Sequence, residues 1–297
     1  MGTAWLEMNA IGLDPLLLLA AAAKQTERIG LGTAILPAFS RHPVALATQA
    51  LSLEGLAPGR LRLGIGTGNA LRMAEAFHHP TDRPLARFRE YVQVVRPLLR
   101  GGAVRFAGEF YSADAYIGEP PMTPVLLSTL GTQAFAAAGE LADGALSWLR
   151  PIGYLLDAAL PAMQRGAAVA GRARPPLIAH VPVALGRADD RAGLREQVRQ
   201  ELSRYVRVPV FARMLAKAGY PVTDSVVTDE LLDELAVIGD EDAVATRLIW
   251  ILEQEMDELM VSLIPETHNR EQEDALLRVL GAIGAGWRDR ENGAGRP

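Results

Sequence analysis

The sequence has no cysteine among its 297 residues. Disulfide bonds, thiolate metal sites and a cysteine nucleophile are therefore excluded. The apolar run Leu16–Ala23 is far shorter than the ~20 residues that a membrane-spanning helix needs. Acidic rather than basic residues, Glu7 and Asp14, precede this run, so it does not read as a signal peptide. We therefore expect a soluble, cytoplasmic protein with no membrane partner.

The sequence also lacks the marks of several large functional classes. Its net charge is −5 and its Lys and Arg residues are scattered, which argues against nucleic-acid binding. A G-x-S-x-G elbow and a GKS or GKT loop are both missing, which disfavours hydrolases and P-loop NTPases. Because no H-x-x-x-H or His–carboxylate pattern occurs, we expect no metal site.

What the chain does contain is a regular alternation of short apolar runs and longer amphipathic ones. Hydrophobic residues make up 49%, enough for one large core. Continuous apolar runs predict parallel strands buried on both faces, and their alternation with helices predicts an α/β sheet or barrel. The predicted strands are 4–8, 29–36, 61–66, 124–128, 144–148, 177–185 and 258–264. The predicted helices are 14–27, 42–56, 84–100, 133–141, 151–171, 240–254 and 270–286.

Two internal segments and the tail interrupt this alternation. Residues 103–121 predict a short hairpin and loop that cover one end of a barrel, and residues 187–236 predict a helical insertion without a strand. Residues 287–297 are polar and Gly-rich and are predicted to be a disordered tail. We therefore expect a single domain over residues 1–286.

The stretch GRLRLGIGTGN holds three alternating glycines, Gly64, Gly66 and Gly68, at the end of a predicted strand. Glycine lets backbone N–H groups approach a ligand closely, and barrel enzymes bind ligands at this end of their strands. Relief of crowding in a barrel core is an equally good explanation. A dinucleotide fingerprint needs a third glycine where Leu71 stands, so that interpretation is disfavoured.

Ordered motifs surround these glycines. The matching residues are Thr26, Arg28, Ile29, Leu31, Gly32 and Thr33, then Arg41 and Pro43, then Ala47, Leu53, Gly59 and Arg60, then Leu63 to Gly68. The runs LLRGG with Glu90 before it, FAGEFY, TPVLLSTLG, AGELADG and IGDEDAVATRL follow. Over about residues 4–286 the chain resembles the bacterial-luciferase-like monooxygenase family, especially its branch of oxidoreductases that use the deazaflavin coenzyme F-420. The resemblance implies a (β/α)8 TIM-type barrel.

The resemblance also implies where a flavin-like ring would bind. The implied cofactor contacts are Glu7, Thr33, Gly66, Thr67, Gly68, Asn69, Ser128, Thr129, Leu130 and Gly131. The segment from Ser128 to Thr132 joins a predicted strand to a helix start, which favours an anion or a carbonyl group of the ring. A plain helix cap by Thr132 is the alternative. Arg150 is a further candidate for a cofactor phosphate, or else a solvated surface group.

The candidate acid or base is less clear, because the sequence departs from the family pattern. Many deazaflavin enzymes of this family carry Asp-His where this chain has Glu7-Met8, and methionine cannot transfer a proton. Glu7 could act as an acid or base if burial raised its pKa, or it could simply hydrogen-bond the cofactor. His42 is the other catalytic candidate, although it also suits a helix start before Pro43.

The resemblance implies an oxidoreductase acting on a small organic molecule, on paired donors or on CH-OH or CH-NH groups. The first hypothesis is hydride transfer between coenzyme F-420 and its substrate. The second is an FMN-dependent monooxygenase that uses oxygen and reduced flavin from a partner reductase. The third is a non-catalytic paralogue that acts by binding. A homodimer is expected because family members are often dimers.

One element of the expected barrel is not visible. The chain opens inside a strand-like run, so an eight-stranded barrel would lack its first strand and helix here. Either the recorded start lies inside the true gene, or the protein begins at the second strand of the barrel.

Overall fold

A computed structural model describes residues 2–8, 12–80, 82–222, 224, 226–264 and 269–293. Backbone contacts divide the chain into two compact units. Unit 1 comprises Met1–Ser147 with Ala159–Leu177, and unit 2 comprises Trp148–Ala158 with Ile178–Pro297. The predicted single domain over residues 1–286 stays a prediction.

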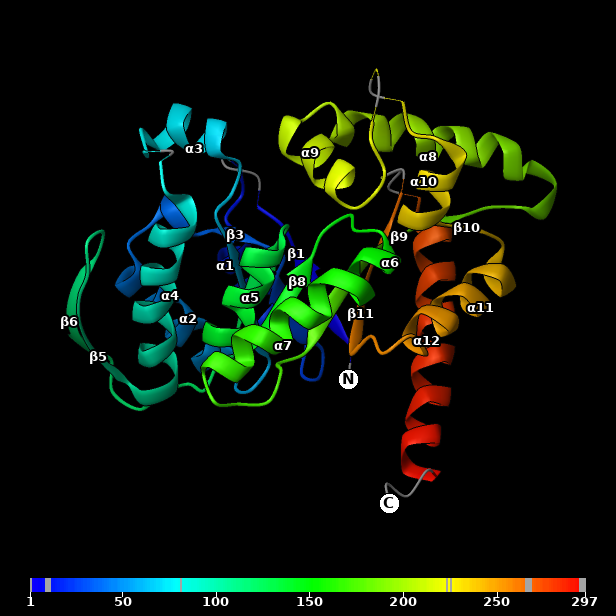
Figure 1. Cartoon of the computed structure of the whole chain (residues 1–297). Helices are drawn as coiled ribbons and strands as arrows, with labels where there is room; N and C mark the ends of the chain where they lie inside the picture. Colours follow the sequence, from blue (N-terminus) through cyan, green and yellow to red (C-terminus); the bar gives the residue numbers. More distant parts are fainter. Residues whose placement is uncertain are drawn as a thin grey trace. The chain divides into compact units, whose positions relative to one another are not determined.

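Unit 1 is built on a parallel sheet whose strands follow the order of the chain. Figure 1 labels β1, β3 and β8 of this unit. The paired strands are β1 (Thr3–Leu6), β2 (Gly30–Thr33), β4 (Leu61–Gly66), β7 (Val125–Thr129) and β8 (Gly144–Ser147), with the short β3 (Leu36–Pro37) beside β4. The Ala34–Ile35 peptide between β2 and β3 is cis. Because all strands are parallel, their carboxyl ends lie at one edge of the sheet, where ligands bind in α/β folds.

Helices connect these strands. They are α1 (Pro15–Gln25), the 3-10 turn η1 (Ala38–Ser40), α2 (Pro43–Leu56), α3 (Ala70–Phe77), α4 (Pro84–Gly101), α5 (Thr132–Leu141) and α7 (Leu160–Val169). Asp14 caps α1 through its side chain, and Gly102 ends α4 with a φ of 74°. The apolar face of α4 is buried, including Tyr91 and Leu98.

The hairpin predicted over residues 103–121 forms, but it lies elsewhere than expected. Strands β5 (Ala103–Ala107) and β6 (Ser112–Tyr116) pair antiparallel and pack along α4. The Glu90 carboxylate of α4 accepts hydrogen bonds from the backbone N–H groups of Glu109, Phe110 and Tyr111. These bonds fix the hairpin turn on the outside of a helix, so the prediction that the hairpin covers a barrel end was wrong.

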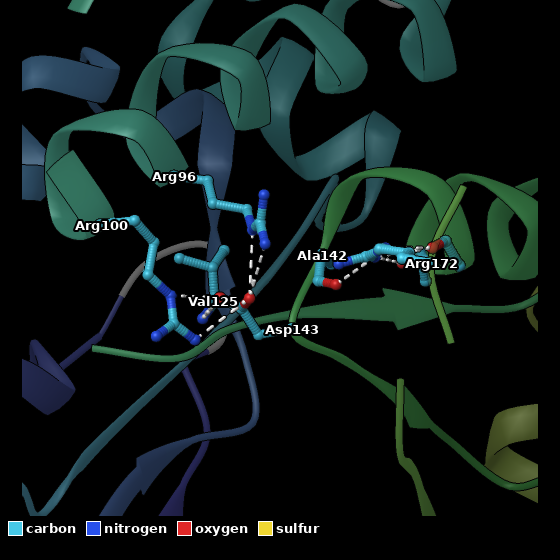
Figure 2. Close-up of polar contacts among 8 residues, drawn as sticks. Arg96, Arg100, Val125, Ala142, Asp143 and Arg172 are labelled. Carbon is cyan, nitrogen blue, oxygen red and sulfur yellow. Dashed lines mark hydrogen bonds and ion pairs between the residues drawn. The ribbon is translucent and has the colours of Figure 1, made fainter. Parts of the chain in front are cut away.

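A second carboxylate, Asp143, ties α4 to the start of β8 (Figure 2). Its oxygens pair with Arg96 at 3.0 Å and Arg100 at 3.1 Å and accept the N–H of Val125 at 3.0 Å. Only 10% of the Asp143 side chain is exposed. The nearby Arg172 donates to the carbonyl of Ala142 at the end of α5. Asp143 of the AGELADG motif therefore links α4 to the starts of β7 and β8 at the amino-terminal edge of the sheet.

Unit 2 contains three parallel strands, of which β9 (Leu177–Leu185) pairs with β10 (Val237–Gly239) and β11 (Glu258–Leu263). All nine residues of β9 are buried, as its continuous apolar sequence predicted. The surrounding helical elements are α6 (Ile152–Tyr154), the π-helical η2 (Leu155–Ala159), the 3-10 turn η3 (Ala188–Asp190), α8 (Arg191–Val206), α9 (Pro209–Lys217), α10 (Asp229–Leu235), α11 (Glu241–Leu252) and α12 (Arg270–Gly293).

The seven predicted strands all form, and the helical insertion over 187–236 contains η3, α8, α9 and α10. The predicted strand 29–36 is divided into β2 and β3, and the short β10 and α3 were not among the predicted elements. Helix α12 continues past residue 287, where a disordered tail was predicted to begin, and residues 294–297 lie outside the described ones. None of the described helices has the length and apolarity that crossing a membrane requires.

Candidate functional site

The carboxyl ends of the unit 1 strands bring the predicted ring-binding residues together. In the sheet register, Leu6 lies beside Thr33, and Ile65 lies beside Leu127. The segments that follow β1 and β2 keep the same register. Ala34 N–H donates to the Leu6 carbonyl at 2.8 Å, and Met8 N–H donates to the Ile35 carbonyl at 3.3 Å. Glu7 follows β1, Gly66 ends β4 and Ser128 lies near the end of β7, so all three are at the carboxyl edge of the sheet.

Thr33 is fully buried and serves as a link between β2 and β4. Its hydroxyl donates to the Gly64 carbonyl at 2.8 Å and accepts the Gly64 N–H at 2.9 Å. The hydroxyl thus replaces a backbone ladder contact. Since its hydrogen is already donated, Thr33 cannot donate a hydroxyl hydrogen bond to a cofactor, and its match to the family motif has a structural reason.

Replacing Thr33 by valine tests this link. The change keeps the side-chain shape but leaves the buried N–H and carbonyl of Gly64 without their partner. We expect the free energy of unfolding, measured by urea denaturation, to fall by about 1–3 kcal/mol. Thr48→Val on the exposed face of α2 is the matched control and should change it by less than about 0.5 kcal/mol. Equal effects of the two substitutions would refute the link.

Glycine is required for different reasons at the three positions Gly64, Gly66 and Gly68. A Cβ on Gly64 would lie 1.9 Å from the Thr33 carbonyl oxygen and 2.6 Å from Leu146 Cδ1, so this glycine relieves crowding. A Cβ on Gly66 would lie 3.0 Å from both Ser128 Cβ and Ile35 Cδ1. Gly68 has a φ of 70°. Gly66 therefore leaves β4 without a side chain next to Ser128, whereas the space beside Gly64 is filled by Thr33 and Leu146.

The residues after Gly66 are placed partly by helix capping. Asn69 is exposed and is the N-cap of α3, where its Oδ1 accepts the N–H groups of Leu71 at 3.1 Å and Arg72 at 3.3 Å. The half-buried Thr67 lies before it, and its hydroxyl contacts the Gly68 carbonyl at 3.4 Å. An asparagine before a helical run is itself a cap signal, and it would have revealed α3.

The turn from β7 to α5 has an open helix start. Gly131 is the N-cap and no side chain caps the helix, so the alternative of a cap by Thr132 was wrong because Thr132 is the first helical residue. Thr129 is buried and donates to the Leu146 carbonyl at 3.2 Å, whereas Ser128 and Leu130 are half-buried. The first N–H groups and the helix dipole at Gly131 favour an acceptor atom or a negative charge.

The two catalytic candidates are both exposed side chains. Glu7 lies directly after β1 at this edge. His42 is also exposed, and it is the N-cap of α2, where Nδ1 accepts the Val44 N–H at 3.3 Å. The helix-entry alternative for His42 is therefore confirmed. Among the described residues no cluster of His, Asp or Glu is placed to hold a metal ion.

Sequence reasoning missed two polar groups beside this edge. Arg41 pairs with Asp14 at 3.0 Å, and its Nη2 lies 3.8 Å from Met8 Sδ, with 13% of its side chain exposed. The Tyr91 hydroxyl is buried without a hydrogen-bond partner in the described structure, and burial raises the pKa of Tyr91. The R-x-P motif pointed to Arg41 only as a family match, while Tyr91 looked like an ordinary core residue of α4.

In unit 2, His180 holds the turn that follows β8. Its ring stacks on Trp148 with centroids 3.9 Å apart. Nδ1 accepts the Leu149 N–H at 3.5 Å, and Nε2 lies 2.9 Å from Ser262 Oγ. Desolvation by burial lowers the pKa of His180 to about 3, so the ring is neutral at physiological pH. Arg150 follows this turn and is only 3% exposed, so the alternative of a solvated surface group was wrong.

The low pKa of His180 predicts a pH dependence of stability. Between about pH 6.5 and 3 the unfolded chain binds a proton on His180 that the folded chain does not, so stability falls as pH falls. We expect a slope of up to about 1.4 kcal/mol per pH unit from this residue below pH 6.5. Urea denaturation of the wild type and His180→Phe between pH 7 and 5 measures it. Parallel profiles of the two proteins would contradict the burial of a neutral imidazole.

Comparisons with known proteins agree with this geometry. The family model of luciferase-like monooxygenases matches residues 2–255. The F-420-dependent glucose-6-phosphate dehydrogenase of Nakamurella multipartita is 32% identical over 249 residues, which are 81% of this chain and 69% of that protein.

Two solved structures share the fold. The F-420-dependent tetrahydromethanopterin reductase of Methanopyrus kandleri superposes with a TM-score of 0.75 and 20% identity, covering 91% of this chain and 87% of that one. The oxygenating constituent of 3,6-diketocamphane monooxygenase from Pseudomonas putida, in complex with FMN, superposes with a TM-score of 0.65 and 19% identity. The match covers 89% of this chain and 82% of that one. The predicted α/β fold of TIM-barrel type is thereby confirmed. The family model matches far more than half of this chain, and the chain therefore belongs to the luciferase-like monooxygenase family.

Proposed function

We propose that this protein is an F-420-dependent oxidoreductase that transfers a hydride between the deazaflavin and a small organic substrate. The observation that carries the proposal is the edge formed by Gly66, Ser128 and Gly131 in unit 1. It combines a strand face without side chains, a half-buried hydroxyl and an uncapped helix start. The relative from Nakamurella multipartita, which is named for F-420 dependence, supports the choice of coenzyme.

The residues present fit a flat, polar-edged ring. A side chain at position 66 would press on Ser128 and Ile35, and glycine leaves β4 without a side chain there. The N–H groups at the start of α5 suit carbonyl oxygens of the ring's pyrimidine half. The remaining predicted contacts, Thr67, Gly68, Asn69, Thr129 and Leu130, would act through backbone atoms, because the Asn69 side chain caps α3 and Thr129 is bonded within the sheet.

The chemistry in this proposal belongs mainly to the coenzyme. When bound, coenzyme F-420 accepts or donates a hydride at C5 of its ring. The chain's part is to hold the ring against the strand ends, to orient the substrate and to exclude water. Glu7 and His42 are exposed, so neither carries an acid or base role in this proposal. A protein of this kind works in the cytoplasm on a small molecule, as a monomer or a homodimer.

An FMN-dependent monooxygenase is the second candidate. It is favoured by the structural likeness to a monooxygenase in complex with FMN. A flavin and a deazaflavin present nearly the same face to Gly66 and Ser128, so the same edge suits both. In this case a partner reductase would supply reduced flavin. A non-catalytic paralogue is the third candidate, and Met8, which cannot carry a proton, favours it.

A paired activity assay separates the three candidates. Under anaerobic conditions, oxidised F-420 is mixed with the protein and a panel of secondary alcohols and sugar phosphates, and loss of the deazaflavin absorbance is followed. In parallel, photoreduced FMN and oxygen are supplied with the same panel, and oxygenated products are sought. Turnover in the first assay supports the proposal. Turnover only in the second supports the monooxygenase, and saturable binding without turnover in either supports the paralogue.

A further inference from the structure

Arg41, beside the carboxyl edge of unit 1, has a guanidinium group in which every nitrogen has a polar partner. Nη2 lies 3.0 Å from Asp14 Oδ2, and Nη1 donates to Gln49 Oε1 at 2.9 Å. Nε donates to the hydroxyl of the neighbouring Ser40 at 3.4 Å. Only 13% of the side chain is exposed. These contacts assign Arg41 to supporting the residues around it rather than to contacting a ligand itself.

The partners of Arg41 are fixed by two helices. Asp14 is the N-cap of α1, where its Oδ1 accepts the Leu16 N–H at 2.8 Å while its Oδ2 pairs with Arg41. Gln49 belongs to α2, which packs against α1. The planar guanidinium is therefore held at several points at once. A lysine ammonium, which is a single compact charge, cannot reproduce these contacts.

The same Nη2 atom reaches a methionine at the end of β1. It lies 3.8 Å from Met8 Sδ, and Met8 is half-buried. A methionine side chain has three rotatable bonds and is among the most adaptable side chains in proteins, and its sulfur is a weak acceptor. A charged donor placed at this sulfur restricts that freedom. Because Arg41 is itself fixed, it holds Met8 in one conformation.

Met8 lies next to the part of the edge that the proposed function gives to the ring. Its N–H donates to the Ile35 carbonyl at 3.3 Å. Ile35 Cδ1 in turn lies 3.0 Å from where a Cβ on Gly66 would be. Met8 is thus separated only by Ile35 from the end of β4 that has no side chain. A change in the conformation of Met8 would alter the space at this end of the strand.

We propose that Arg41 is a positioning residue, which fixes Met8 as an apolar wall of the ring-binding edge. Met8 then contributes by its shape, which does not require it to transfer a proton. The contact of Met8 with a ring rests on the proposed function, whereas the link between Arg41 and Met8 does not. The two parts are therefore tested separately.

Hydrogen exchange tests the link without any coenzyme. Arg41→Lys keeps a positive charge beside Asp14 but cannot reach Gln49 and Met8 at the same time. Exchange is followed by mass spectrometry on peptides that contain residues 2–8. We expect the Met8 amide to exchange about 3- to 10-fold faster in Arg41→Lys than in the wild type.

Arg60→Lys is the matched control. Arg60 is also held at several points, because it donates to the Thr26 hydroxyl and the Ala23 carbonyl, both at 3.0 Å. It directly precedes β4 and so lies at the opposite edge of the sheet. This variant loses comparable contacts but should leave the exchange of Met8 unchanged.

Fluorescence titration of coenzyme F-420, or of FMN if F-420 does not bind, tests the effect on the ring. We expect Arg41→Lys and Met8→Ala each to bind about 10-fold more weakly than the wild type, and Arg60→Lys to bind like it. Because Arg41 acts through Met8, adding Arg41→Lys to Met8→Ala should weaken binding by less than about twofold. If Arg41 contributed only general stability, the two losses would multiply.

Three results would overturn the proposal: equal exchange of Met8 in Arg41→Lys and the wild type, equally tight ring binding by these two proteins, or losses that multiply in the double variant. If the wild type binds neither ring while Arg41→Lys still speeds the exchange of Met8, the proposed function fails and the link stands. If Arg41→Lys does not fold, Asp14→Asn replaces it, since asparagine still caps α1 but lacks the charge that holds Arg41.

Discussion

Gly64→Ala is expected to lower the free energy of unfolding by about 3 kcal/mol or more. The new Cβ would lie 1.9 Å from the Thr33 carbonyl oxygen, which is backbone and cannot swing aside. It would also press on Leu146 Cδ1 at 2.6 Å. The cross-link between Thr33 and Gly64 would have to open, so β2 and β4 would separate where the ring-binding edge begins. Urea denaturation followed by circular dichroism measures the change.

Gly55→Ala is the matched control for this prediction. Gly55 is an exposed residue inside α2, and a Cβ there meets nothing within 4 Å. Since alanine favours a helix over glycine, this variant should gain about 0.5–1 kcal/mol. A Gly64→Ala protein as stable as the wild type would show that the sheet tolerates a side chain at position 64.

Ser128→Trp is expected to weaken binding of a flavin or deazaflavin by about 100-fold or more, which corresponds to about 2.7 kcal/mol. Ser128 is half-buried beside the side-chain-free face of β4, and its Cβ lies 3.0 Å from where a Cβ of Gly66 would be. An indole at this position would occupy the space that the proposal gives to the ring. Binding is measured by fluorescence titration.

Two further variants control for indirect effects. Glu27→Trp places the same bulk at an exposed residue before β2, at the opposite edge of the sheet, and should bind like the wild type. Ser128→Ala keeps the space open and should lose less than about 10-fold, because it removes at most one hydrogen bond. If Ser128→Trp does not fold, Thr67→Trp takes its place. Unchanged binding by a folded Ser128→Trp protein would show that the ring does not bind at this edge.

The fold could be predicted from the sequence largely because its strands are continuous apolar runs. Strands β4 and β9 have the predicted bounds, because β4 is buried except at the half-buried Arg62 and β9 is buried throughout. Short elements were not predicted for a physical reason. Strand β10 has three residues and directly precedes Asp240, the N-cap of α11, so the sequence there indicates a helix start rather than a strand. The placement of the hairpin depends on Glu90, a long-range contact that no periodicity encodes.

The site could be predicted less completely. The motifs located the carboxyl edge of the sheet, but the role of each residue depends on contacts between residues that are far apart in the sequence. Thr33 and Gly64 are adjacent only in the sheet, so their mutual hydrogen bonds are invisible in the sequence. Arg150 could be flagged as a phosphate candidate, yet its burial without a partner depends on Tyr154 and on Met214 of α9. The exposure of Glu7 likewise depends on how the strand ends pack.

The most direct test of the central claim is a fluorescence titration of coenzyme F-420 with the wild-type protein and with Ser128→Trp, with FMN titrated in the same way. The account predicts a saturable change in F-420 fluorescence with the wild type, tighter than for FMN, and its loss in Ser128→Trp at unchanged thermal stability. The absence of any saturable change with either F-420 or FMN in the folded wild-type protein would contradict it.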